Sequence, residues 1–468
     1  MDRTRHTFPV VLLAAAAGLS GCTLAPKYER PPLPVTDAFP AEAAAVPAAE
    51  PAAKDVPWQE FFTDARLRSV IDLALANNRD LRVAALNVQK AQALYRIQRS
   101  ELNPTVGVQA TGERHRIPES IGKDGKASVS STYTVGLGLA SWELDLFGRL
   151  RSLKTRALEQ YLATEEARRG AQTSLVAAVA GSWLSLAADE ENLALSKGTL
   201  EAQGAACELI RKSREAGIAS DLDLRQAESQ VEAARASVAA YTGAAAVSRN
   251  ALELLVGAKV PEELLPARLV AVTDPKGLSA GLPSDVLLRR PDILAAEHQL
   301  RGANANIGAA RAAFFPRISL TAGLGTSSPD LDGLFKSGTR MWTFAPQIVS
   351  PLFASGSLFA NLKVSKVDRE IAVATYEKAI QAAFAEVSDA LALRTTLVAQ
   401  REAQDALVVA LEETLRLSDA RYKGGIDAYL PVLLAQQSLF GAQRAAVGVR
   451  FAEQANLVTL YKVLGGGV

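Results

Sequence analysis

The sequence predicts a mainly α-helical chain that also supplies four β-strands to a membrane β-barrel, built as a tandem structural repeat. Long stretches without proline are rich in helix-forming residues. Four segments of roughly ten residues alternate apolar with small or polar side chains, as barrel strands do. Motifs also recur at a nearly constant offset, which indicates a duplication.

Composition excludes several functional classes. Of the 468 residues 49% are hydrophobic, and 51 basic side chains nearly balance 50 acidic ones. No nucleic-acid partner is therefore expected, because such proteins carry a basic bias. Three histidines and two cysteines are too few to suggest a metal site. We expect no catalytic residues, no metal and no cofactor, and therefore no enzyme.

Residues 1–21 have the features of a signal peptide, namely a basic start and an apolar run of about a dozen residues. That run is too short to span a bilayer as a helix. Residues 19–22, Leu-Ser-Gly-Cys, resemble a bacterial lipobox, which implies diacylglycerol and an N-acyl chain such as palmitate on Cys22. Thr23 resembles the outer-membrane sorting case. An ordinary signal with an incidental cysteine is the alternative.

Proline-rich and proline-free segments divide the mature chain. Residues 22–57 are rich in proline and alanine and are expected to form a linker between lipid and fold. The proline-free stretch from Arg149 to Ala216 predicts one helix of roughly 100 Å at 1.5 Å per residue. A stack of shorter helices is the alternative, with breaks at three glycines: Gly170, Gly181 and Gly204.

The two repeats are residues 58–290 and residues 291–468. The segment from Asp80 to Pro104 returns as Asp292 to Pro316 at an offset of 212, and Gly217 returns as Gly425 at an offset of 208. Each repeat should therefore hold the same elements, namely helices, two strands and a long helical hairpin. The hairpin turns are expected near residues 217–220 and 424–427, where Gly217, Gly424 and Gly425 can end the preceding helices.

The strands are expected at about 105–113 and 132–141 in the first repeat, and at about 317–326 and 341–350 in the second. The polar segments 115–131 and 327–340 are expected to be external loops. Aromatic residues near the strand ends fit an interfacial girdle. The alternation alone fits a soluble antiparallel sheet packed on helices equally well.

The strand count predicts the assembly if the sheet faces lipid. An open sheet edge cannot lie in hydrocarbon, because its backbone groups would lack hydrogen-bond partners. Two chains would close a side-chain-filled barrel of eight strands, whereas three would close a 12-stranded barrel wide enough to conduct. A homotrimer is therefore expected, with the helices of the three chains forming a helical barrel below the sheet.

Several short motifs carry a family resemblance, namely Asn77–Leu81, Tyr95–Arg99, Trp142–Arg149, Leu282–Asp285, Arg289–Ile293 and Ile307–Pro316. Together they resemble an outer membrane factor of the TolC superfamily, in the OprM-like lipoprotein branch that serves resistance-nodulation-division (RND) pumps. The resemblance covers the chain from Cys22 to Gly467.

This resemblance implies a lipid-anchored channel in the outer membrane of a Gram-negative bacterium. A trimeric β-barrel would continue into a long α-helical periplasmic barrel, with an equatorial belt near Val260–Ser284 and the C-terminus. The channel would be the passive, gated exit duct of a tripartite efflux pump for antibiotics and other toxic compounds. Its partners would be outer membrane lipid, a periplasmic adaptor (membrane fusion) protein and an inner-membrane RND transporter.

The family resemblance also places a gate at the periplasmic tip, on the helix that follows the second turn. Leu430 matches the family's leucine ring. Leu434 stands where the family commonly has aspartate, so cation selection by a carboxylate ring is not carried over. Both leucines lie on one helix face, and such rings can close a narrow pore by dewetting.

Four further gate candidates follow by analogy with turn contacts in the family: Tyr422, Asp221, Asp223 and Arg225. Helix capping and solvated charge are the alternative interpretation of each. Ser220 or Asp221, and Asp427 in the second turn, are the expected helix caps.

Three rival functions remain at this point. The same architecture would serve a type I protein secretion system or a metal-ion efflux system. A soluble coiled-coil lipoprotein is a third possibility, although the two separate strand pairs disfavour it.

Overall fold

The computed structural model describes residues 23–36, 39, 57–122, 125–273 and 284–466. The predicted signal peptide, the lipidation site Cys22 and most of the linker lie outside these residues. The chain divides into two compact units, and each unit takes segments from both halves of the sequence. The sheet unit comprises Met1–Pro32, Asn87–Glu165 and Ala295–Tyr376, and the helical unit comprises Leu33–Leu86, Glu166–Leu294 and Glu377–Val468.

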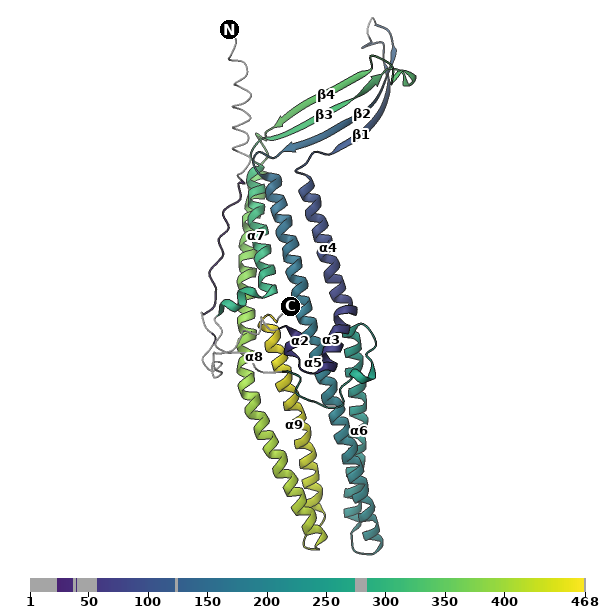
Figure 1. The fold of residues 1–468 in the computed structure, drawn as a ribbon, viewed down its shortest axis with the longest axis vertical. Helices are drawn as coiled ribbons and strands as arrows, with labels where there is room; N and C mark the ends of the chain where they lie inside the picture. Colours follow the sequence, from purple (N-terminus) through teal and green to yellow (C-terminus); the bar gives the residue numbers. More distant parts are fainter. Residues whose placement is uncertain (1–22, 37–38, 40–56, 123–124, 274–283, 467–468) are drawn as a thin grey trace. The chain divides into compact units, whose positions relative to one another are not determined.

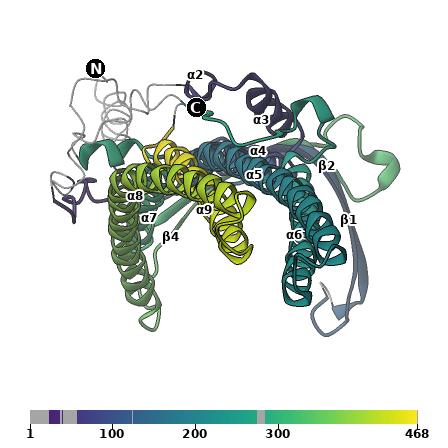
Figure 2. The same ribbon diagram turned by 90° about the horizontal axis from the view of Figure 1, so that it is seen from below.

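Helices account for most of the described residues (Figure 1). The α-helices are α2 (Trp58–Phe61), α3 (Ala65–Asn77), α4 (Arg79–Ser100), α5 (Arg149–Glu215), α6 (Asp221–Val256), α7 (Pro291–Ala312), α8 (Ser357–Lys423) and α9 (Leu430–Val463). The 3₁₀ turns among the residues that the structure describes are η4 (Glu262–Leu264), η5 (Ser284–Arg289) and η6 (Leu331–Gly333). In the helical unit, α5 and α6 run side by side as one hairpin, and α8 and α9 form a second hairpin (Figures 1 and 2).

The long helix predicted from Arg149 is present as a single element. Helix α5 has 67 residues, and the stack of shorter helices is wrong because Gly170, Gly181 and Gly204 all lie inside it. A glycine costs a helix about 1 kcal/mol. Packing of buried side chains such as Trp183 and Leu184 offsets that cost. One window of α5 is long and apolar enough to cross a membrane, but 61% of it is buried inside the protein, as in a core helix.

Aromatic contacts organise the core of the helical unit. The ring of Phe61 stacks on that of Tyr461 with centroids 4.3 Å apart, and Phe62 is fully buried beside them. The indole Nε1 of Trp183 donates to the carbonyl of Leu264 at 3.1 Å. These contacts join α2 to the C-terminal helix α9, and the segment after α6 to α5.

Four antiparallel strands make the sheet, in the order β1 (Val106–Ile117), β2 (Ser128–Leu144), β3 (Arg317–Ser328), β4 (Arg340–Val349). The strands begin near the expected positions, but β1 and β2 extend further into the predicted loop 115–131. Pairing continues to Ile117 opposite Ser128. The polar residues there suggest a loop, but the pairing of antiparallel strands rests on backbone hydrogen bonds, which polar side chains do not prevent.

Candidate functional site: the helical turns and the sheet faces

The two hairpin turns share one backbone geometry. Gly217 and Gly425 have φ angles of +79° and +70°, a left-handed conformation that glycine adopts at no steric cost. In each turn the next residue closes the helix end: the N–H of Ile218 donates to Ser213 O at 2.9 Å, and the N–H of Ile426 donates to Arg421 O at 3.0 Å. The offset of 208 residues seen in the sequence therefore relates equivalent hydrogen bonds.

In the first turn, the charged gate candidates pair within their own hairpin. Ser220 caps α6 in a capping box, with Asp223 N–H donating to Ser220 Oγ at 3.1 Å and Ser220 N–H donating to Asp223 Oδ2 at 3.0 Å. Asp221 accepts from Arg214 Nε at 2.8 Å. Arg225 pairs with Glu228 at 2.8 Å. The capping bonds contribute about 1 kcal/mol, and the exposed ion pairs contribute about 0–1 kcal/mol each.

The second turn lacks the helix cap that the sequence predicts. Asp427 does not cap α9, whose N-cap is Tyr429 without a side-chain cap bond. Asp427 instead accepts from Arg421 Nε at 2.5 Å and from Arg421 Nη2 at 3.0 Å. Those bonds lower the pKa of Asp427 below its usual value. Gly424 follows the end of α8, and its N–H donates to Ala420 O at 3.0 Å.

A small apolar cluster joins the two hairpins beside the turns. Tyr429 is only 7% exposed, and its ring meets that of Tyr422 edge-on with centroids 5.0 Å apart. Burial, followed by the neighbouring Tyr422, raises the pKa of Tyr429 to about 12. We call this the tip cluster; its other buried members are Cys207, Ile210, Ala227, Val432 and Leu433. Sequence reasoning missed Tyr429, although its helical spacing to Val432 and Leu433 was a usable signal.

The two leucine gate candidates lie on an exposed face of α9 outside the tip cluster. Leu430 is 45% exposed and Leu434 is 54% exposed, whereas Val432 and Leu433 are buried. One chain therefore leaves two large apolar side chains uncovered at the start of α9.

The two faces of the sheet differ in chemistry. Directly paired residues form an apolar row across all four strands, namely Val108, Leu137, Leu324 and Trp342. Each of these side chains is more than half exposed. The alternating row Gly107, Gly138, Gly323 and Thr343 points the other way. A hollow of about 460 Å³ lies against the sheet, and its lining includes residues of both rows.

The start of the mature chain forms a strap along α7. The carbonyls of Leu24 and Pro26 accept from Arg311 Nη1 (3.0 Å) and Asn304 Nδ2 (2.8 Å). Further along, Arg30 Nη2 donates to Glu297 Oε2 at 2.7 Å. The strap therefore runs antiparallel to α7, with its N-terminal end beside the end of α7 that leads into β3.

Comparisons with known proteins agree with this geometry. The family model described as outer membrane efflux protein matches residues 70–258 and 282–466. The antibiotic efflux pump outer membrane protein ArpC of Pseudomonas putida is 46% identical over 458 residues, covering 97% of this chain and 95% of that protein. The outer membrane protein OprJ of Pseudomonas aeruginosa is 44% identical over 467 residues, covering 99% and 96%.

Solved structures show the same fold. The open-state structure of the Neisseria gonorrhoeae MtrE outer membrane channel has a TM-score of 0.88 and 41% identity, and it covers 95% of this chain and 98% of that one. The predicted fold class and the outer membrane localisation are confirmed. The family model matches most of the chain, and relatives with 44% and 46% identity cover nearly all of the chain. The chain therefore belongs to the outer membrane efflux protein family.

Proposed function

We propose that the protein is the trimeric, passive exit duct of a tripartite efflux pump, with no catalytic step of its own. The observation that carries the proposal is the four-stranded sheet, which has two chemically distinct faces and, among the described residues, two unpaired edges. Strands β1 and β4 are the edges within one chain. Hydrocarbon cannot satisfy their backbone groups, so each edge requires the edge of a neighbouring copy. Three copies give twelve strands and a lumen wide enough for water.

The apolar row would face lipid, and the row of glycines and Thr343 would face the lumen. Spin labels test this assignment on adjacent positions. A label at Leu324→Cys should collide with dissolved oxygen, which concentrates in lipid, whereas a label at Thr343→Cys should collide with a water-soluble nickel chelate. Both variants carry Cys207→Ser so that the label has one target among the described residues. Equal access of the nickel chelate to both positions would refute the lipid assignment.

The transport role requires partners that engage the periplasmic helices. An inner-membrane RND transporter would supply the energy, and a periplasmic adaptor would connect it to this duct. Relatives named for antibiotic and toluene efflux support antibiotics and other toxic, largely apolar compounds as cargo. Deleting the gene should sensitise the cell to such compounds as strongly as deleting the cognate transporter. Loss of protein secretion without drug sensitivity would favour a type I secretion duct instead.

We also propose that Cys22 carries the lipid anchor. The strap supports this, because Leu24 is held beside the end of α7 that leads into the sheet. Only Thr23 lies between Leu24 and Cys22, so an acyl chain there would start close to the membrane part of the chain. Labelled palmitate should enter the wild type but not Cys22→Ser. Equal labelling of both proteins would contradict the anchor.

A further inference from the structure

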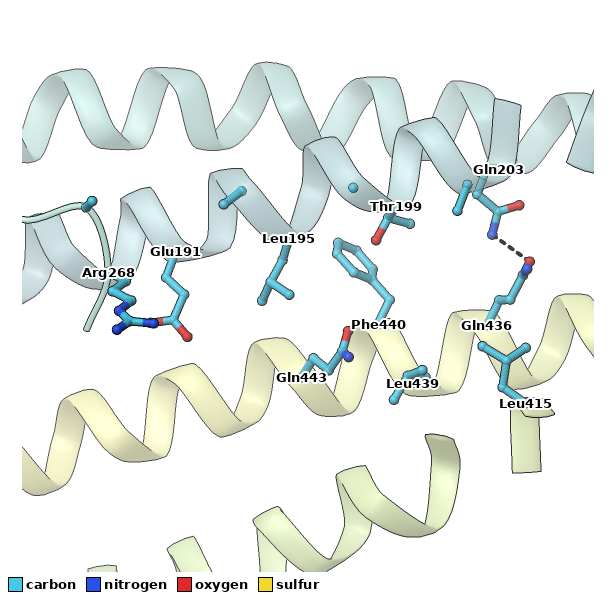
Figure 3. Close-up of a pocket in the computed structure, with 14 residues that line it drawn as sticks. Glu191, Leu195, Thr199, Gln203, Arg268, Leu415, Gln436, Leu439, Phe440 and Gln443 are labelled. Carbon is cyan, nitrogen blue, oxygen red and sulfur yellow. Dashed lines mark hydrogen bonds between the residues drawn. The ribbon is translucent and has the colours of Figure 1, made fainter. Parts of the chain in front are cut away.

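A pocket of about 620 Å³ lies between α5 and α9 in the helical unit, apart from the turns and the sheet (Figure 3). Its α5 wall carries Ala194, Gly198 and Ala202, which recur every four residues and so share one helix face. Its α9 wall carries Leu439 and Phe440. Because these side chains are small, they leave a space between α5 and α9 whose volume lies within the range of small-molecule sites.

Neutral amides close one end of the pocket. Gln203, which is only 5% exposed, donates from Nε2 to Oε1 of Gln436 at 3.0 Å and so bridges α5 and α9 (Figure 3). Phe440, Leu195 and Thr199 project into the space between the two helices beside this bridge (Figure 3). The middle of the pocket is therefore mainly apolar.

The opposite end of the pocket carries an unbalanced positive charge. Glu191 is there, but it already accepts from Arg450 Nη2 at 2.6 Å and from the N–H of Leu269 at 2.9 Å. Arg268, on the segment after η4, lines the same end (Figure 3). Within the described residues no carboxylate pairs with Arg268. The guanidinium of Arg268 is therefore available to a ligand. A guanidinium can bind a carboxylate through two parallel hydrogen bonds.

We propose that this pocket binds a single-chain anionic amphiphile, with its carboxylate on Arg268 and its alkyl chain along the α5–α9 gap. The twelve-residue separation of Glu191 and Gln203 on α5 corresponds to roughly 18 Å at 1.5 Å per residue. An extended alkyl chain advances about 1.25 Å per bond, because its bonds of about 1.5 Å zigzag, so a chain of about a dozen carbons spans roughly 14 Å and lies within that length. The pocket forms within one chain, so the inference does not rest on the trimeric duct.

The site is tested with radiolabelled dodecanoate and equilibrium dialysis. The purified, acylated protein is held in an amphipathic polymer free of detergent, and the empty polymer gives the background. Wild type should show one saturable site per chain. Gly198→Leu should weaken binding at least tenfold, because a side chain there fills the pocket. Gly243→Leu on α6 is the matched control; at both glycines an added Cβ meets no atom within 4 Å.

The ligand class is tested with Arg268→Gln and with dodecanol, the uncharged analogue. Wild type should bind dodecanoate three- to tenfold more tightly than dodecanol, and Arg268→Gln should abolish that preference. Arg235→Gln, on the exposed part of α6, should keep it. Saturable binding that Gly198→Leu leaves unchanged would overturn the site, as would the absence of saturable binding. Equal wild-type affinity for the two probes would overturn the anionic class.

Discussion

Near the turns, some side chains have partners within their own chain, whereas others are exposed and available to a neighbouring copy. Leu430 and Leu434 are left exposed, while the charged candidates Asp221, Asp223 and Arg225 find partners in their own hairpin. An exposed leucine pair on one helix face suits a ring that is completed by other copies. The apolar pair, rather than the charges, is therefore the stronger gate candidate.

Replacing both leucines should open the proposed gate. Leu430→Ala combined with Leu434→Ala should raise single-channel conductance in a planar bilayer, because the smaller side chains leave a wider pore that wets more easily. The control is Leu393→Ala with Leu407→Ala, two leucines of similar exposure on α8 away from the turns. Unchanged conductance of the first double variant would rule out the leucine gate.

The aromatic ring of Tyr429 should stabilise the folded protein, whereas its hydroxyl should not. Its buried Oη has no hydrogen-bond partner in the described structure. Tyr429→Phe should therefore be neutral or stabilise the protein by about 1 kcal/mol. Tyr429→Ala should destabilise it by about 3–5 kcal/mol, because it empties the tip cluster. Denaturant unfolding, monitored by hydrogen exchange of the turn amides, compares the two. A strongly destabilised phenylalanine variant would show that the hydroxyl has a partner.

The same residue predicts a loss of stability in alkali. The pKa of Tyr429 is about 12 in the folded chain, against 10.0 for free tyrosine. The unfolded state ionises first, so stability is complete below pH 10 and falls as pH rises towards 12. The full loss would be roughly 2–3 kcal/mol. Tyr429→Phe should unfold less readily than wild type across this range, and identical alkaline profiles would contradict the burial of Tyr429.

At the scale of elements, one buried carboxylate on α7 holds the strap against this helix. The side chain of Glu297 is 3% exposed and accepts from Arg30, Arg301 and Tyr28. Burial alone would raise the pKa of Glu297, but hydrogen bonds from the two arginines outweigh burial and lower it. The strap is therefore stable above pH 4.5, and its stability falls as pH drops through the lowered pKa.

Removing that charge should release the strap without unfolding α7. Glu297→Gln should weaken the contact by about 2 kcal/mol, because charge-assisted hydrogen bonds are lost. The amides of residues 24–32 should then exchange with deuterium roughly tenfold faster or more. Glu370→Gln, on the exposed part of α8, should exchange like wild type. Equal protection in both variants would mean that Glu297 does not hold the strap.

Elements with local signals were predictable from the sequence. The turns at Gly217 and Gly425 combine a required left-handed glycine with a repeat offset, and α5 follows from its composition. The strap was missed because Arg30 meets Glu297 across 267 residues, and no local pattern encodes that contact. The extension of β1 to Ile117 was missed because its polar residues resemble a loop and only pairing with β2 reveals the strand.

At the scale of the whole molecule, one chain leaves its functional surfaces unfinished. Within the described residues the sheet has two open edges, and its apolar row is exposed. The start of α9 exposes two leucines. Three copies would resolve all of these features together, because they close the sheet, surround a lumen and bring the leucines into a ring. The trimer is therefore the central claim.

Native mass spectrometry of the acylated protein, released directly from outer membrane vesicles, tests that claim most directly. Edge-to-edge closure of the four-stranded sheets predicts a single dominant species with the mass of three chains. A dominant species of one or two chains would contradict the account, because neither can enclose a water-filled lumen with these strands.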